Sequence, residues 1–136
     1  MSGITETVEF IKKCDHFFIA TLDENEQPRV RPFSLIFEAD GKIIIGTGTH
    51  KNVYKQFQGH PQIEISAYNN STLKWVRLNG KAIEDTKPEY VKKAFESDIH
   101  LKDIYNEKTG LEMVLYHIDK PHSTIYSFTD NPVTLI

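Results

Sequence analysis

The sequence predicts a mainly β protein, a small closed antiparallel β-barrel with peripheral α-helices. Short runs rich in β-branched and aromatic residues recur along the chain, turns of a few polar residues separate them, and helical patterns interrupt them at isolated points. A sheet must cover its apolar face, and closing it on itself does so within a short chain. With 136 residues, of which 39% are hydrophobic, the chain fits a single domain over residues 1–136.

The first half of the chain is expected to form a helix, three strands and a second helix. Residues Thr5–Cys14 have the apolar stripe of a short amphipathic helix. The β-branched and aromatic runs then predict strands at Phe17–Leu22, Arg29–Phe37 and Ile43–Ile45. We expect a loop at Gly46–Thr49, followed by a helix at Lys51–Gln58 with Gly59 as its C-cap.

The second half is expected to add two long strands, two helices and a closing hairpin. Alternating apolar residues predict strands at Gln62–Tyr68 and Leu73–Glu84, and Gly80 inside the second strand indicates either a bulge or a bend at a barrel corner. The capping-box pattern Thr86-Lys87-Pro88-Glu89 predicts a helix that starts at Lys87 and ends near Ser97. The remaining elements are expected to be a short helix at Ile99–Tyr105 and a hairpin of Leu111–Ile118 with Ser123–Phe128.

Composition and charge disfavour several classes of protein. Lys and Arg number 16 against 19 Asp and Glu, and no basic run is present, which disfavours a nucleic-acid-binding protein. No stretch has the roughly 20 apolar residues that a membrane span needs. Cys14 is the single cysteine, which fits the reducing cytoplasm. The histidines lack His-x-His and His-Glu-x-x-His spacing, so no metal site is predicted.

A candidate anion site lies where the third expected strand meets the second helix. Gly46-Thr47-Gly48-Thr49 brings hydroxyl groups to the start of a helix, and Lys51 and Asn52 follow. Unpaired amides and the positive end of the helix dipole both favour phosphate there. One strand earlier, Arg29 and Arg31 alternate and therefore share a face. A plain turn with an N-cap explains the same loop, and neither a P-loop nor the dinucleotide-binding glycine motif is present.

Three segments, in order, resemble the pyridoxamine 5'-phosphate oxidase-like, FMN-binding split-barrel family. They are Pro28–Phe33, Ile45–Asn52 and Trp75–Ala82. The resemblance implies a split barrel in which the first segment lies along the flavin and the loop-to-helix junction holds its phosphate. The FMN-binding residues that it implies are Arg31, Pro32, Phe33, Ser34, Thr47, Thr49, Lys51, Asn52 and Trp75.

The same resemblance implies a homodimer, because the position of Trp75 contacts the flavin across the subunit boundary in the family. The alternative for this single tryptophan is a side chain of the core or of the dimer interface, and the two are compatible. His50-Lys51-Asn52 stands where the family often has Ser-Arg-Lys. One cation is therefore missing, and either Arg29 or Arg31 is expected to compensate for it.

The function implied is that of a cytoplasmic FMN-dependent oxidoreductase that acts on a small-molecule substrate or takes electrons from a nicotinamide donor. No catalytic side chain is predicted, because the flavin ring itself carries hydride and electron transfer. Pyridoxal-phosphate-forming oxidases complete their substrate site with an arginine-bearing C-terminal segment, whereas no arginine follows Arg77 here, so that activity is not expected. The alternatives are a non-catalytic flavin-binding or redox-sensing module, and a relative that binds haem or a deazaflavin.

Overall fold

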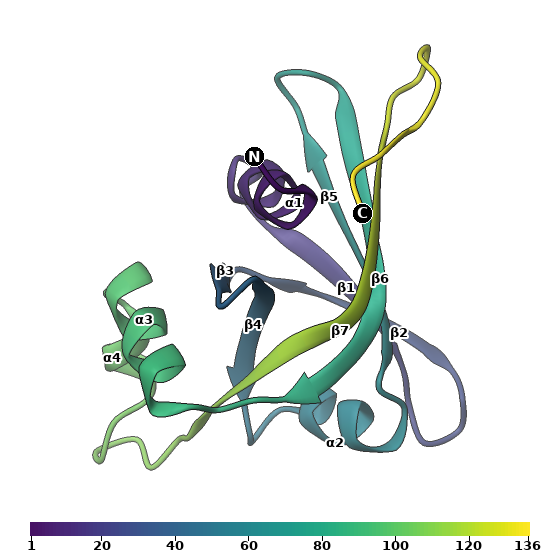
Figure 1. Ribbon diagram of the computed structural model, residues 1–136. Helices are drawn as coiled ribbons and strands as arrows, with labels where there is room; N and C mark the ends of the chain where they lie inside the picture. The colour runs from purple at the N-terminus through teal and green to yellow at the C-terminus, as the bar shows by residue number, and fades with distance from the viewer.

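The computed structural model describes all residues, 1–136, and its centre is one twisted antiparallel sheet (Figure 1). The strands are β1 Phe17–Leu22, β2 Pro28–Phe33, β3 Ile36–Ala39, β4 Lys42–Gly48, β5 Gln62–Asn69, β6 Lys74–Glu84, β7 Met113–Tyr126 and β8 Val133–Thr134. The helices are α1 Gly3–Lys12, α2 Asn52–Gly59, α3 Pro88–Ser97 and α4 Leu101–Ile104.

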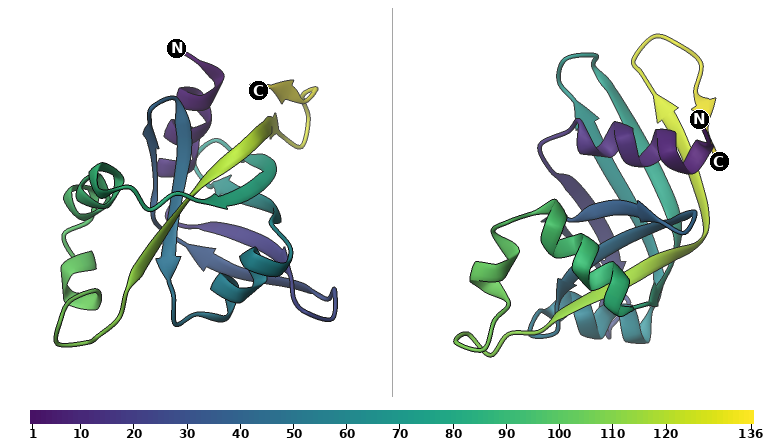
Figure 2. Two further views of the ribbon diagram at one scale, coloured as in Figure 1. Left: turned by 60° about the horizontal axis from the view of Figure 1, so that its bottom comes forward. Right: turned by 60° about the vertical axis from the view of Figure 1, so that its left-hand side comes forward.

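The sheet forms a split barrel. Its strand order is β2-β1-β5-β6-β7-β4-β3, with β8 beside β7, and every pair is antiparallel. The end strands β2 and β3 are not paired with each other, so the hydrogen bonding does not run around the full circle (Figure 2). The prediction of a mainly β, antiparallel split barrel with peripheral helices is confirmed, but the barrel is open at this one seam.

The seam lies where the sequence predicts one continuous strand, Arg29–Phe37, and that prediction is wrong. Ser34 and Leu35 separate β2 from β3. Phe33 pairs with β1 at one end of the sheet, and Ile36 pairs with β4 at the other. A single straight strand cannot pair with strands at both ends of a curled sheet, so the strand is interrupted at Ser34 and Leu35.

The predicted closing hairpin is also wrong, because β7 is one strand of 14 residues. Both of its halves pair with β6, from Trp75↔Tyr126 to Glu84↔Tyr116. The predicted bulge at Gly80 is confirmed by a shift in register between Asn79 and Lys81. Pro121, which has no N–H to donate, lies in β7 opposite this irregular stretch, and the bulge therefore lets the strand continue.

The expected capping box before α3 does not form. The Thr86 hydroxyl accepts from Leu115 N at 3.1 Å and donates to Leu115 O at 3.4 Å, so it ties the segment to β7. The N-cap residue of α3 is Lys87, and it makes no side-chain capping bond. The helix begins at Pro88, one residue after the predicted start at Lys87, because proline's fixed φ suits a first helical turn.

Two hydrophobic cores position the elements. The larger fills the barrel and includes Ile43 and Ile45, while the smaller lies outside it, between β3, β4, β7 and the helices α3 and α4, and includes Ile44. Side chains alternate along a strand, so a run of three buried isoleucines indicates a strand with apolar packing on both faces.

Helices close the two ends of the barrel. Helix α2 buries Val53 and Phe57, and the Phe57 ring meets that of Tyr116 edge-on at 4.6 Å between centroids. Helix α1 lies at the other end, where Thr7 and Ser123 form a buried hydroxyl–hydroxyl bond of 2.7 Å to β7 (Figure 2). No helix of the structure is both long enough and apolar enough to cross a membrane.

Candidate functional site

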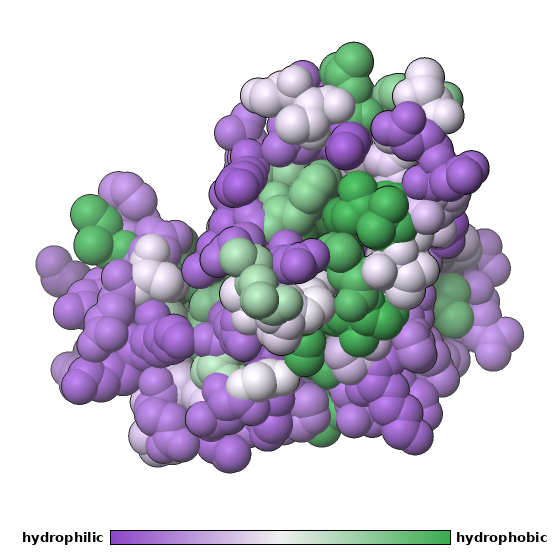
Figure 3. Space-filling model, turned by 45° about the horizontal axis from the view of Figure 1, so that its top comes forward, coloured by the Kyte–Doolittle hydropathy of each residue, from purple (hydrophilic) through white to green (hydrophobic).

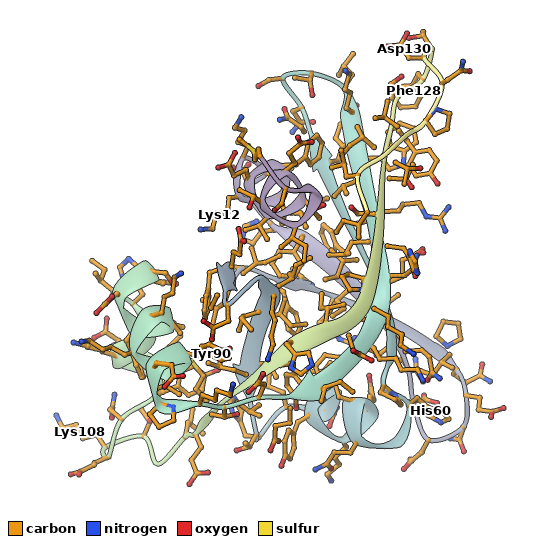
Figure 4. The ribbon with its side chains drawn as sticks, in the orientation of Figure 1. Lys12, His60, Tyr90, Lys108, Phe128 and Asp130 are labelled. Carbon is orange, nitrogen blue, oxygen red and sulfur yellow. The ribbon has the colours of Figure 1, made fainter.

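An open cleft of about 930 Å³ lies between α2 and the β1–β2 hairpin. In Figure 4 the labelled His60, which lines this cleft, lies beside α2 and the hairpin. Three of the predicted FMN-binding residues line it from two elements distant in sequence. These are Arg31 from β2 and Lys51 and Asn52 from the start of α2. The strand β2 and the start of α2 therefore meet at this cleft, although β2 and β4 are not neighbouring strands.

Positive charge exceeds negative charge in this cleft. The basic side chains are Arg29, Arg31, Lys51 and Lys55, and the acidic ones are Asp23 and Glu24. Asp23 is already engaged, since it accepts from Gln27 N and Asn25 N at 2.9 Å and from Arg29 Nε at 2.9 Å. These hydrogen bonds, led by the Gln27 amide, lower the pKa of Asp23. The cleft therefore favours an anionic ligand.

The start of α2 adds unpaired amides. Lys51 is the N-cap residue in an extended conformation and makes no side-chain capping bond. Lys51 N donates to Gly48 O and Tyr54 N to Lys51 O, both at 3.1 Å, but Asn52 N and Val53 N have no acceptor in the protein. Both residues line the cleft. A helix of eight residues thus presents free N–H groups and its positive dipole end to the same space as the cations.

Arg31 is held by neutral groups alone. Its Nη1 donates to Thr21 Oγ1 at 2.7 Å and to Ile19 O at 3.2 Å, and its Nη2 donates to Gln56 Oε1 at 2.5 Å. No carboxylate lies within ion-pair distance of it, in contrast to Arg29 and Arg77. Burial lowers the pKa of the Arg31 guanidinium, as expected for a cation that is removed from water without a counter-ion.

The other predicted site residues lie outside this cleft. Pro32 is exposed on β2, while the Phe33 side chain is buried in the barrel core against Phe17, at 5.9 Å between ring centroids. Ser34 lines a separate hollow of about 390 Å³ beside the end of α1. Phe33 can therefore offer a ligand in the cleft only its backbone.

The predicted glycine–threonine loop is mostly strand. Thr47 pairs with Val114 inside β4, and its side chain is buried. Only Thr49 and the two residues after it form the turn into α2, and Thr49 N donates to Glu112 O at 3.0 Å. The strand extends this far because β7 supplies a partner for each residue up to Gly48.

Trp75 lies at the other end of the sheet from the cleft. Residues at the start of β5 next to α2 pair with Lys81, whereas Trp75 pairs with Tyr68 at the far end of β5. Trp75 stacks on Tyr126 at 5.8 Å and packs against Phe128 at 5.1 Å. We call Tyr68, Trp75, Tyr126 and Phe128 the aromatic surface; Phe128 is labelled at the top of Figure 4.

Sequence reasoning missed Thr21, Gln56, Lys55 and His60 as cleft residues or as partners of cleft residues. Gln56 follows Asn52 by four positions, the spacing of neighbours on one helix face, and this signal could have located it. Thr21 carries no such signal, because a threonine in a strand is ordinary.

Comparison with known proteins identifies related sequences and folds. The family model described as pyridoxamine 5'-phosphate oxidase matches residues 4–115. A NimC/NimA family protein from Clostridium acetobutylicum is 35% identical, with 98% of this chain and 91% of that chain covered and a TM-score of 0.87. No curated protein matches the sequence.

Two more distant structures share the fold. A protein from C. acetobutylicum related to general stress protein 26 of B. subtilis, of the pyridoxinephosphate oxidase family, has a TM-score of 0.70 at 12% identity, covering 96% of this chain and 92% of that one. A heme binding protein from Mycobacterium smegmatis has the same TM-score and identity, covering 98% of this chain and 58% of that one.

Proposed function

Because the chain belongs to the pyridoxamine 5'-phosphate oxidase family, we propose that it is a flavoprotein that binds FMN with the phosphate in the cleft beside α2. The observation that carries the proposal is Arg31, a partly buried guanidinium that has only neutral partners and that shares the cleft with two unpaired amides. A phosphate dianion would satisfy all three groups at once.

The residues present fit the phosphate of FMN. Arg31 and Lys51 supply charge, and the amides of Asn52 and Val53 supply directed hydrogen bonds. Arg29 compensates for the cation missing from the helix start, although it shares its charge with Asp23. The backbone of Pro32 to Ser34 continues from the cleft along the open seam of the barrel, and we assign it to the flavin itself.

We further propose that the protein is a flavin-dependent oxidoreductase with a small-molecule substrate or a nicotinamide electron donor, and that it does not form pyridoxal phosphate. FMN supplies hydride or electron transfer when it is bound. The chain's own part is to hold the phosphate, to orient the ring and to exclude water from it. No acid or base of this chain is needed for the transfer.

The proposal includes a homodimer. In the aromatic surface, Phe128 is 73% exposed and Tyr68 is 40% exposed, while Trp75 and Tyr126 are half-buried. Hydrophobic residues also gather on the face that carries α1, the β5–β6 hairpin and the C-terminal tail (Figure 3). Trp75 lies at the far end of β5 from the cleft, and we therefore assign its contact with the flavin to a second copy of the chain.

Two measurements test this function. Purified protein titrated with FMN should show a shifted oxidised-flavin absorption band, and riboflavin, which lacks the phosphate, should bind more weakly. Bleaching of that band by NADH or NADPH supports the oxidoreductase, whereas a flavin that neither nucleotide reduces supports a sensing module or another donor. A protein that ignores FMN contradicts the proposal.

A second candidate is haem binding, which rests on the fold shared with the heme binding protein from M. smegmatis and on His60 in the cleft. Imidazole is a common axial ligand of haem iron. A haem absorption band in place of a flavin band, lost in His60→Ala, would favour this candidate over FMN.

A further inference from the structure

Thr21, Arg31 and Gln56 form a closed ring of hydrogen bonds at the wall of the cleft. Arg31 Nη1 donates to Thr21 Oγ1 at 2.7 Å, Thr21 Oγ1 donates to Gln56 Oε1 at 2.5 Å, and Arg31 Nη2 donates to the same Gln56 oxygen at 2.5 Å. The ring joins β1, β2 and α2. The directions of its hydrogen bonds are fixed, because a guanidinium only donates and the hydroxyl has a single proton.

The ring fixes the orientation of Arg31 but leaves part of it free. A guanidinium with its Nε has five N–H groups, and three are used here, by Thr21, Ile19 O and Gln56. Two N–H groups therefore remain for a ligand in the cleft. A long side chain that is already held in place loses little entropy when the ligand binds.

Because the side chain of Gln56 is uncharged, it leaves the positive charge of Arg31 available in the cleft. A carboxylate at this position would hold the guanidinium just as firmly, but it would cancel the positive charge. The amide oxygen holds it without doing so. Thr21 and Ile19 O are likewise uncharged, so none of the partners of Arg31 competes with an anion for its charge.

We propose that Gln56 is a specificity-determining residue: as a neutral acceptor it positions Arg31 while preserving its charge, and the cleft therefore selects the phosphorylated flavin over the unphosphorylated one. This inference rests on the proposed function. Gln56 is a positioning residue, since it acts on the ligand through Arg31. If Gln56 only held α2 against the barrel, it would make the same hydrogen bonds. Its substitution would then affect the binding of FMN and of riboflavin equally.

The test compares Gln56→Glu with Gln58→Glu, both titrated with FMN and with riboflavin. Gln56→Glu keeps the shape of the side chain and its hydrogen bonds to Thr21 and Arg31, but its carboxylate cancels the positive charge of Arg31. Gln58 is exposed on the same helix and does not line the cleft, so Gln58→Glu controls for the added charge. We expect Gln56→Glu to lower FMN affinity about tenfold or more, with riboflavin affinity unchanged and with the control like the wild type.

A second variant guards against loss of folding. Thr21→Val keeps the shape of a β-branched strand residue and removes two of the three hydrogen bonds of the ring, the one from Arg31 and the one to Gln56. It should also lower FMN affinity while leaving riboflavin affinity unchanged, and a thermal unfolding curve checks that both variants fold.

The outcomes separate the two proposals. A wild-type protein that binds no FMN overturns the proposed function and this inference together. Two other results overturn only the role of Gln56, provided that the wild type binds FMN and Gln56→Glu folds. In the first, Gln56→Glu binds FMN as well as the wild type does. In the second, it loses affinity for FMN and for riboflavin to the same extent. If Gln56→Glu does not fold, Thr21→Val takes its place: the role of Gln56 is overturned if this variant binds FMN as well as the wild type does, or if it loses affinity for FMN and riboflavin to the same extent.

Discussion

Lys51 lies at the N-cap of α2, and its side chain is exposed at the cleft. We predict that Lys51→Ala weakens FMN binding by about 1–3 kcal/mol through the loss of a charge-assisted hydrogen bond to the phosphate. Riboflavin binding should not change. Fluorescence titration with both flavins measures the effect, and Lys108→Ala, in the loop beyond α4 (Figure 4), is the control. Unchanged FMN affinity would contradict the phosphate assignment.

Asp85 follows β6 directly, and its carboxylate side chain is only 10% exposed. Burial raises its pKa, but hydrogen bonds from His117 Nδ1 at 2.7 Å and Lys42 Nζ at 3.4 Å outweigh burial and leave the pKa below its ordinary value. A pKa that is lowered in the folded state stabilises the protein above the unfolded-state pKa of about 3.9, and this stabilisation is lost as pH falls through the folded-state pKa.

We therefore predict that Asp85→Asn lowers the free energy of unfolding at neutral pH and flattens its decline below about pH 4. Urea unfolding over a pH series measures both effects. Asp103, whose side chain is 83% exposed, provides the control Asp103→Asn. Parallel pH profiles for the wild type and Asp85→Asn would show that the lowered pKa of Asp85 contributes nothing to stability.

The sequence predicts the charged and helix-start residues of the cleft but not the neutral ones. The predicted residues that line the cleft are Arg31, Lys51 and Asn52. They could be predicted because charged residues and the starts of helices are recognisable in a sequence. Thr21 and Gln56 were missed, because a hydroxyl or an amide becomes important only through the neighbour that the fold gives it. Which cation lacks a counter-ion likewise depends on distances between side chains.

At the scale of elements, the bulge between β6 and β7 depends on Gly80. A Cβ added there would lie 2.5 Å from Ile118 Cγ2 and 2.8 Å from Asp119 O. We predict that Gly80→Ala destabilises the fold by about 1–3 kcal/mol, because the backbone of β7 must shift to accommodate the methyl group. Chemical denaturation measures this effect. Gly59→Ala, which meets nothing within 4 Å, should be neutral or stabilising. Equal stability of the two variants would contradict the close approach.

The strands that local pattern predicts well are those bounded by turns. The strand Phe17–Leu22 is predicted with its observed bounds, and β5 and β6 are predicted to within one residue at each end. Two errors in strand pairing are at Ser34–Leu35 and at the expected turn around Asp119–His122. In the first case the chain changes partner strands without a turn signal, and in the second Pro121 indicates a turn although β6 continues beside it. Pairing between distant strands decides both.

On the scale of the whole molecule, the cleft beside α2 and the aromatic surface lie at opposite ends of the barrel sheet. One chain cannot close a flavin site with both. Two chains related by a twofold axis can, because each then brings its aromatic surface to the cleft of the other. The site would be shared, so a substitution in either place should weaken FMN binding.

A shared site predicts complementation between two weak binders. Lys51→Ala and Trp75→Ala proteins should each bind FMN poorly. After they are mixed under conditions that exchange subunits, a heterodimer carries both substitutions at one site and neither at the other. Random pairing makes about half of the dimers heterodimers, so about a quarter of all sites should regain wild-type affinity. Titration of the mixture with FMN measures the recovered fraction.

The matched control is a mixture of Lys51→Ala with Arg31→Ala, which removes the second cationic side chain of the cleft. Both substitutions lie on the cleft side of the proposed site, so each site of a heterodimer keeps one of them and no affinity should return. If FMN affinity recovers in the Lys51→Ala and Trp75→Ala mixture but not in the control mixture, the cleft and the Trp75 of one site must come from different chains. Absence of recovery, in subunits shown to exchange, places Trp75 outside the flavin site and leaves the aromatic surface with a purely structural role.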